Sequence, residues 1–310
     1  MSEEKRFAVQ VRNLTRYYGV FKAVDNLSFK VPINSCFGLL GPNGAGKSTT
    51  IKMLTGLIRP SNGSISIMGH PAGSLAARRY VGYLPEKYGF DEKWLVIDFL
   101  TYIGELYGLK KSVAEERALE LLDWIGLEGW EVEELGALSA GMKQRVGIVQ
   151  ALISDPDILI LDEPATNLDA IGRADVLKKI RELVDKKGKT VIISSHILLE
   201  VEKVADHVAI INHGKTLAYG NLDELKSKMN LIHIEVDKPE VLLDLLEQQK
   251  FVEHVSIARN RIIVKSRNIL ELERLVLKAV LENNLKLYYF SSKGANLEEL
   301  FLGLVSGGEQ

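Results

Sequence analysis

Segments with a strand-like pattern, some of them continuous apolar runs, recur along the first two thirds of the chain. They occupy residues 7–12, 23–31, 37–40, 64–68, 80–84, 158–161, 190–193 and 207–211. A turn at Tyr17-Tyr18-Gly19 separates the first two segments. One helical pattern ends at about Leu57, and another covers about 170–186. Strands that alternate with helices are typical of a mostly parallel sheet covered by helices. We therefore expect an α/β fold.

The apolar period changes from about Phe90 to Ser154. In this stretch the apolar residues lie three and four positions apart, as in Ala118 to Ile125, which predicts helices. We expect a helical subdomain at about 87–154, inserted into the sheet.

A second domain is expected after Gly220. The pattern there is strand, helix, strand, strand, helix and strand, at 231–236, 239–249, 252–257, 262–265, 269–282 and 285–290. This is the βαββαβ order of a ferredoxin-like unit, with a turn at Arg259-Asn260 and a short helix at Asn296–Leu304. The expected domains are therefore 1–220 and a small α+β accessory domain at 221–310.

The composition narrows the class of protein. A hydrophobic content of 46% with 26% charged residues is ordinary for a globular protein, and 39 basic against 41 acidic residues predict no nucleic-acid partner. The single cysteine, Cys36, excludes a disulfide framework and is expected to be a small core residue. No apolar stretch reaches the roughly 18 residues of a membrane span. No signal-peptide pattern follows Met1, so we expect a cytoplasmic chain.

A complete phosphate-binding loop lies between a short apolar strand and a helical pattern. It matches G-x-x-x-x-G-K-[ST], whose glycines turn backbone N–H groups toward phosphate oxygens. Lys47 is expected to reach the β- and γ-phosphates, and the Ser48 hydroxyl to ligate Mg²⁺. The candidate ATP-binding residues are Gly41, Pro42, Asn43, Gly44, Ala45, Gly46, Lys47, Ser48 and Thr49.

Two adjacent carboxylates end the apolar strand at 158–161. Asp162 can hold the magnesium directly or through water, and Glu163 can act as general base on the water that attacks the γ-phosphate. A solvated strand end would also explain an isolated Asp-Glu pair, but the loop at residues 41–49 favours the catalytic interpretation.

A second glycine-containing turn precedes this acidic strand. Leu138-Ser139-Ala140-Gly141-Met142-Lys143-Gln144-Arg145 resembles the signature sequence of ABC transporter ATP-binding subunits, and the resemblance covers roughly residues 6 to 220. It implies that Ser139 and Gly141 open a helix that contacts the γ-phosphate of ATP held by a second copy of the protein. The family's usual form is Leu-Ser-Gly-Gly-Gln, so Ala140 and Met142 are departures.

Three further roles follow from the resemblance. His196 corresponds to the switch histidine, which contacts the γ-phosphate, and Asp169 belongs to the loop that passes between subunits. Tyr18 corresponds to the aromatic residue that stacks on adenine, with Tyr17 as the competing choice.

A glutamate replaces the family's usual glutamine after the strand at 80–84. Glu86 can still ligate Mg²⁺ or a water molecule, although it adds negative charge near the phosphates. In this substitution the chain resembles the daunorubicin-type exporter ATPases. Those proteins also carry a Leu-Glu-Glu-x-Phe stretch, like the one at 297–301 here.

The resemblance implies an ATPase subunit of an exporter, with ATP and Mg²⁺ as cofactors. Its partners would be a second ATPase subunit, identical or different, and an integral membrane permease on whose cytoplasmic side it sits. The alternative is an ABC-type ATPase that acts on ribosomes, DNA or iron–sulfur assembly, but such proteins usually have two cassettes in one chain or long coiled-coil insertions. A P-loop kinase or GTPase is disfavoured because neither class requires the 138–142 turn.

Overall fold

The chain folds as two units that meet in sequence after Gly220. A computed structural model describes residues 7–87, 89–227, 231–258, 261–291, 297–298 and 301. In the first unit, six strands form a sheet in the order β10-β9-β3-β8-β7-β6. These strands are β3 (Cys36–Leu40), β6 (Val81–Leu84), β7 (Ile158–Asp162), β8 (Thr190–Ser195), β9 (His207–Asn212) and β10 (Lys215–Asn221).

The pairs β9–β3, β3–β8, β8–β7 and β7–β6 are parallel, as the alternating pattern predicts. Strands β3 and β7 are buried along their whole length, which explains their nearly continuous apolar sequence. Their carboxyl ends meet at one edge, where Leu40 lies opposite Ser195 and Asp162 opposite Ser194. The segments that follow β3, β6, β7 and β8 therefore converge there.

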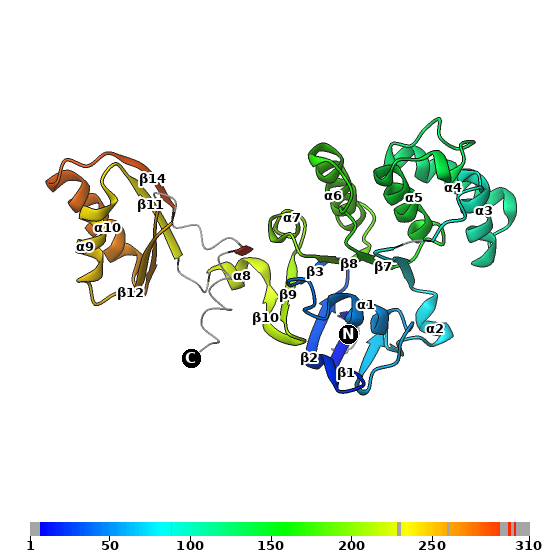
Figure 1. Cartoon of the computed structure of the whole chain (residues 1–310), viewed down its shortest axis with the longest axis horizontal. Coiled ribbons are helices and arrows are strands. Elements are labelled where there is room, and N and C mark those ends of the chain that lie inside the picture. The colour runs from blue at the N-terminus through cyan, green and yellow to red at the C-terminus, as the bar shows by residue number, and fades with distance from the viewer. Residues whose placement is uncertain are drawn as a thin grey trace. The chain divides into compact units, whose positions relative to one another are not determined.

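Helices cover the parallel sheet, with α1 (Lys47–Leu54) on one side and α6 (Ala170–Asp185) on the other (Figure 1). Between β6 and β7 the chain forms α3 (Val96–Leu106), α4 (Lys111–Ile125), the 3₁₀ turn η2 (Leu135–Ala137) and α5 (Ala140–Leu152). A Cβ at Gly82 of β6 would overlap the Ala151 carbonyl, so this glycine permits α5 to pack closely on β6. Short helices complete the unit, α2 (Leu75–Arg78) and α7 (Leu198–Glu202).

A second, antiparallel sheet of the first unit has the order β2-β1-β4-β5. Its strands are β1 (Phe7–Tyr18), β2 (Phe21–Pro32), β4 (Asn62–Ile67) and β5 (His70–Pro71). The turn predicted at Tyr17-Tyr18-Gly19 lies later in the chain, because both tyrosines still belong to β1 and Tyr18 pairs with Phe21. Gly19, with φ of +58°, makes the reversal.

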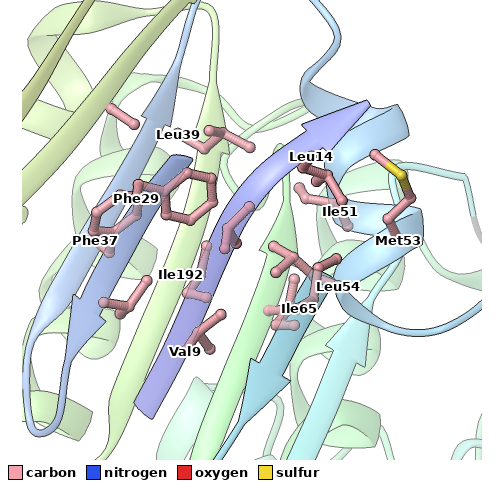
Figure 2. Close-up of a cluster of buried hydrophobic side chains, with 14 of the residues drawn as sticks. Val9, Leu14, Phe29, Phe37, Leu39, Ile51, Met53, Leu54, Ile65 and Ile192 are labelled. Atoms are coloured by element: carbon pink, nitrogen blue, oxygen red, sulfur yellow. The ribbon is translucent and has the colours of Figure 1, made fainter. Parts of the chain in front are cut away.

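The main core lies between the two sheets and α1. Figure 2 shows Val9, Leu14 and Phe29 of the antiparallel sheet facing Phe37 and Ile192 of the parallel sheet. The Phe29 and Phe37 rings stack with centroids 5.2 Å apart. Burying each such large side chain contributes about 1.5–3 kcal/mol, so the core fixes α1 and the loop before it.

The second unit has its own sheet, in the order β12-β13-β11-β14 with antiparallel pairs. Its elements are α8 (Leu222–Ser227), β11 (Leu231–Val236), α9 (Pro239–Glu247), β12 (Val252–Ala258), β13 (Arg261–Ser266), α10 (Ile269–Glu282) and β14 (Leu287–Ser291). Apolar residues of α9 and α10 pack on one face of this sheet.

One predicted helix end differs from the structure, and two predicted elements lie wholly or mostly outside the described residues. Helix α1 ends at Leu54, before the predicted Leu57, because Gly56 adopts φ of +74° against Gly73. The predicted turn at Arg259-Asn260 and most of the predicted helix at Asn296–Leu304 lie outside the described residues. Across the described part of the chain, none of the helices has the length and apolar character to span a bilayer.

Candidate functional site

A cavity of about 510 Å³ lies at the carboxyl edge of the parallel sheet. It collects side chains from the ends of β1, β6, β7 and β8 around the loop after β3. Its lining residues are Tyr18, Phe21, Ala23, Pro42, Asn43, Gly44, Gly46, Lys47, Ser48, Thr49, Glu86, Glu163, Thr166 and His196. Most residues that the sequence singled out therefore meet in one place, while Gly41, Ala45 and Asp162 lie beneath the lining.

Close backbone packing sets the shape of the phosphate-binding loop. Gly46 adopts φ of +102°, and a Cβ there would lie 2.6 Å from the Ala23 carbonyl oxygen. A Cβ at Gly41 would lie 2.9 Å from the Ala45 Cβ. Helix α1 begins at Lys47, so its first N–H groups and the positive end of its dipole belong to the cavity.

The Lys47 ammonium is buried beneath this loop. Its Nζ donates to the carbonyl oxygen of Gly41 at 2.7 Å and to that of Pro42 at 3.3 Å. The Glu163 Oε1 atom lies 3.6 Å from the same nitrogen. A buried cation needs such partners, and together they hold a positive charge where the cavity meets the loop.

Glu163 is held in an unusual backbone conformation at the end of β7. Its φ of +53° is in the left-handed region, which costs free energy for a residue with a Cβ. The N–H of Glu163 donates to Ser194 Oγ at 2.9 Å, and its carbonyl oxygen accepts from Gln144 Nε2 at 3.3 Å. Both contacts hold the strained residue, one from β8 and one from α5.

The Glu163 side chain faces His196. Oε2 of Glu163 lies 3.0 Å from Nδ1 of His196 and 3.5 Å from the Thr166 hydroxyl. His196 and Thr166 thus contact the same oxygen, Oε2, while Oε1 is the oxygen that lies near Lys47. A carboxylate oriented in this way can accept a proton from a water molecule in the cavity.

Asp162 is buried next to Glu163 and points toward the loop. Its Oδ1 accepts from Ser194 Oγ at 2.6 Å, and Ser48 also hydrogen-bonds this carboxylate. Burial raises the pKa of Asp162, the charges of Glu86 and Glu163 raise it further, and the two serine hydroxyls oppose the shift. Burial raises the pKa of the Tyr83 phenol to about 12, with further contributions from the charges of Asp162 and Glu86.

The protein oxygens near the loop would need water or phosphate ligands to hold a metal ion. No group of three His, Cys, Asp or Glu residues within the described ranges could hold a metal ion. Mg²⁺ is usually held by one or two carboxylates, water and substrate phosphates, so the donor set of Ser48, Asp162 and Glu86 fits that ion without a cage of protein ligands.

The structure distinguishes the two candidate tyrosines. Tyr18 lines the cavity, and Phe21 lies opposite it in the β1–β2 register. Tyr17 is absent from the lining, and the ammonium of Lys22 lies 5.5 Å from its ring centroid. Of the two tyrosines, Tyr18 is therefore the one that lies at the cavity.

Two capped turns, which contain Ser139, Gly141 and Asp169, lie outside the cavity lining. Ser139 Oγ accepts from the Met142 N–H at 3.3 Å and so caps α5, while Asp169 Oδ1 accepts from the Gly172 N–H at 2.8 Å and caps α6. A Cβ at Gly141 would lie 2.9 Å from Leu168 Cδ2, so the two turns pack together.

Several residues contribute to the site without having been predicted from the sequence. Phe21 and Thr166 line the cavity, and Ser194 and Gln144 hold the backbone of Glu163. Ser194 carried a signal, because it is a polar residue at the end of an apolar strand. Gln144 belongs to the 138–145 segment, but its contact with Glu163 could not be predicted because it depends on how α5 packs.

Comparison with known proteins identifies the family. Residues 24–166 match the family model described as ABC transporter. The chain is 36% identical to the ABC transporter ATP-binding protein YxlF of Bacillus subtilis (strain 168), over 96% of this chain and 99% of that protein. It is also 36% identical to Nod factor export ATP-binding protein I of Burkholderia orbicola, over 96% of each chain. The bacitracin transport ATP-binding protein BcrA of Bacillus licheniformis is 34% identical, over 97% of this chain and 98% of that protein.

Solved structures agree with this relationship. An ATP-binding subunit of an ABC transporter superposes with a TM-score of 0.65 at 33% identity, covering 71% of this chain and 92% of that one. A dimeric ATP-binding cassette with bound ADP and Pi shares the fold, with a TM-score of 0.65 at 22% identity over 69% of this chain and 98% of that one. The full-length relatives, the shared fold and the assembled phosphate-binding cavity lead to one conclusion: the chain belongs to the ATP-binding subunits of ABC transporters and is an ATPase.

Proposed function

We propose that this ATPase powers an exporter through a separate membrane-spanning permease. The relatives named for Nod factor export and bacitracin transport match almost their whole length, which supports an export role. Glu86, placed at the cavity, supports the resemblance to daunorubicin-type exporters. The chain would then be cytoplasmic and attached to the membrane through its partner.

ATP would be held between two copies of the ATPase, or between this chain and a related one. The observation that carries this proposal is that Ser139, Gly141 and Asp169 form two capped, exposed turns outside their own chain's cavity. The positive end of the α5 dipole, which begins at this turn, suits a phosphate from a neighbouring chain. ATP would stabilise the closed pair because it contacts both chains only there.

The residues of the cavity would divide the chemistry. Lys47 and the loop amides would bind the β- and γ-phosphates, and Glu163 would accept the proton of the attacking water. His196 would orient Glu163 and contact the γ-phosphate. Ser48, Asp162 and Glu86 would hold Mg²⁺, which neutralises phosphate charge when bound.

A groove near the helical segment would receive the permease. A second cavity of about 280 Å³ lies between the end of α1, β6 and the residue after α3, and Leu57, Tyr83 and Tyr107 are among its lining residues. Leu57 and Leu106 are 63% and 65% exposed, so this part of the surface is apolar. We propose that the helices at 87–154 form a subdomain that carries this surface, within an ATP-binding domain at 1–220.

The second unit would support the dimer or brace the transporter. Its sheet places the first strand, β11, between β13 and β14, which supports the ferredoxin-like assignment of the domain at 221–310. A chain shortened at Gly220 that transports as well as the full chain would contradict this role.

The variant Glu163→Gln tests the proposed mechanism. It removes the proton acceptor with little change of shape, so ATP binding should persist, turnover should fall by about 10²–10⁴-fold, and ATP should trap a dimer. Light scattering with and without ATP measures the dimer, and phosphate release measures turnover. Normal turnover would remove Glu163 from the mechanism, and a monomer with bound ATP would contradict the shared site.

A further inference from the structure

Arg16 packs against Tyr18, which lines the cavity and is the residue that we propose contacts the base. Its guanidinium carbon lies 4.9 Å from the centroid of the Tyr18 ring, within the roughly 6 Å range of a cation–π interaction. The two residues are two positions apart on β1 and therefore share a face of the strand. Arg16 itself does not line the cavity. The guanidinium thus covers Tyr18 from outside the cavity.

The guanidinium is anchored at its far side. Nη1 of Arg16 donates to the carbonyl oxygen of Arg59 at 2.9 Å. Two more bonds join the same loop to β1, from the Ser61 N–H to the Thr15 carbonyl at 2.8 Å and from the Tyr17 N–H to Ser61 Oγ at 3.0 Å. Since this loop follows α1, the arrangement connects the base end of the cavity to the helix that begins at the phosphates.

The Arg16 side chain is half-buried. Its Nε atom is buried and has no hydrogen-bond partner among the described residues. Partial burial strengthens the attraction between a cation and an aromatic ring. The ring contact and the Arg59 carbonyl therefore fix the guanidinium.

We infer that Arg16 is a positioning residue for recognition of the nucleotide base. It orders the Tyr18 ring before the base arrives, so less side-chain freedom is lost on binding. Its charge also draws electron density from the ring, which favours stacking on an electron-rich purine. This inference rests on the proposed contact between Tyr18 and adenine.

The test compares ATP with inorganic tripolyphosphate, which has no base, on the full chain. Arg16→Gln removes the charge and should weaken ATP binding by about two- to fivefold while tripolyphosphate binding stays unchanged. Arg16→Lys keeps the charge and should recover part of the ATP affinity. Lys22→Gln removes the equivalent cation from Tyr17, which is outside the cavity, and should change neither affinity.

A double-mutant cycle separates the inference from the proposed function. Arg16→Gln should have no further effect on ATP binding once Tyr18→Ala is present. If Tyr18→Ala weakens ATP binding and Arg16→Gln does not, Arg16 has no positioning role. Equal losses for ATP and tripolyphosphate in Arg16→Gln would also overturn the inference, since they would show a general structural effect. If Tyr18→Ala binds ATP normally, the proposed base contact itself is wrong.

Discussion

Nδ1 of His196 lies 3.0 Å from Oε2 of Glu163, although the two residues follow different strands, β8 and β7. The other carboxylate oxygen of Glu163 lies 3.6 Å from the Lys47 ammonium. Each oxygen of the Glu163 carboxylate therefore has a partner from a different part of the site. Lys47 belongs to the phosphate loop, and His196 restricts the rotation of the carboxylate toward the cavity.

His196→Ala should reduce turnover much more than ATP binding. Glu163 would keep its backbone contacts but lose the partner that orients its carboxylate, and misplaced catalytic groups cost about 10²-fold. Phosphate release and equilibrium ATP binding measure the two quantities. His254→Ala, in the second unit, serves as the matched control. A variant of His196 with normal turnover would exclude the histidine from the mechanism.

Two inactive variants should complement each other when mixed. Lys47→Ala lacks the ammonium group that would bind phosphate. Ser139→Ala lacks the hydroxyl of the turn that we assign to the neighbouring site. In a mixed pair, one site combines an intact loop with an intact turn, so activity should return to at most about half of the parental level. Titrating one variant into the other measures this recovery. If Ser139 acted within its own chain, every mixture would stay inactive.

Gly46→Ala should destabilise the phosphate loop. The added Cβ would require a left-handed backbone and would lie 2.6 Å from the Ala23 carbonyl oxygen, which cannot move freely. We expect a loss of about 1–3 kcal/mol and loss of ATP binding. Gly69→Ala controls for backbone strain, because Gly69 has φ of +82° but no atom within 4 Å of its Cβ. Thermal unfolding of both variants measures the difference, and equal losses would exclude the contact with Ala23.

Asp155→Asn should lower stability in a pH-dependent way. Lys189 and Arg117 contact the Asp155 carboxylate at 2.8 and 3.0 Å, and they lower its pKa, chiefly through the Lys189 hydrogen bond. The carboxylate therefore stabilises the fold above its unfolded pKa of about 4, and this contribution disappears as the pH falls through the lower folded value. Because the group is partly exposed, we expect a loss of about 0.5–1 kcal/mol at pH 7.

Asparagine suits this test because Asp155 has φ of +55°, a conformation that asparagine tolerates. Urea unfolding of parent and variant at pH 7 and near pH 3 gives the comparison. A stability difference of the same size at both pH values would show that the charge is not its cause.

The sequence pattern predicted the types of most elements because each depends on local periodicity. The ends of α10 agree with the pattern to the residue, and α6 ends within one residue of the expected position. Element ends that depend on packing were less accurate. Gly56 ends α1 early because it meets Gly73, a residue that no local pattern connects to it.

The site shows the same division. The sequence by itself determined the chemical groups: the phosphate loop at 41–49, the carboxylates at 162 and 163, and the turn at 138–142, since each is a short contiguous motif. Only the tertiary structure decided that Tyr18 and not Tyr17 reaches the cavity, and that Ser139 lies outside the cavity. It also decided that Ser194 and Gln144 hold the backbone of Glu163. Those relationships depend on strand order, register and helix packing, which arise from contacts between residues far apart in the chain.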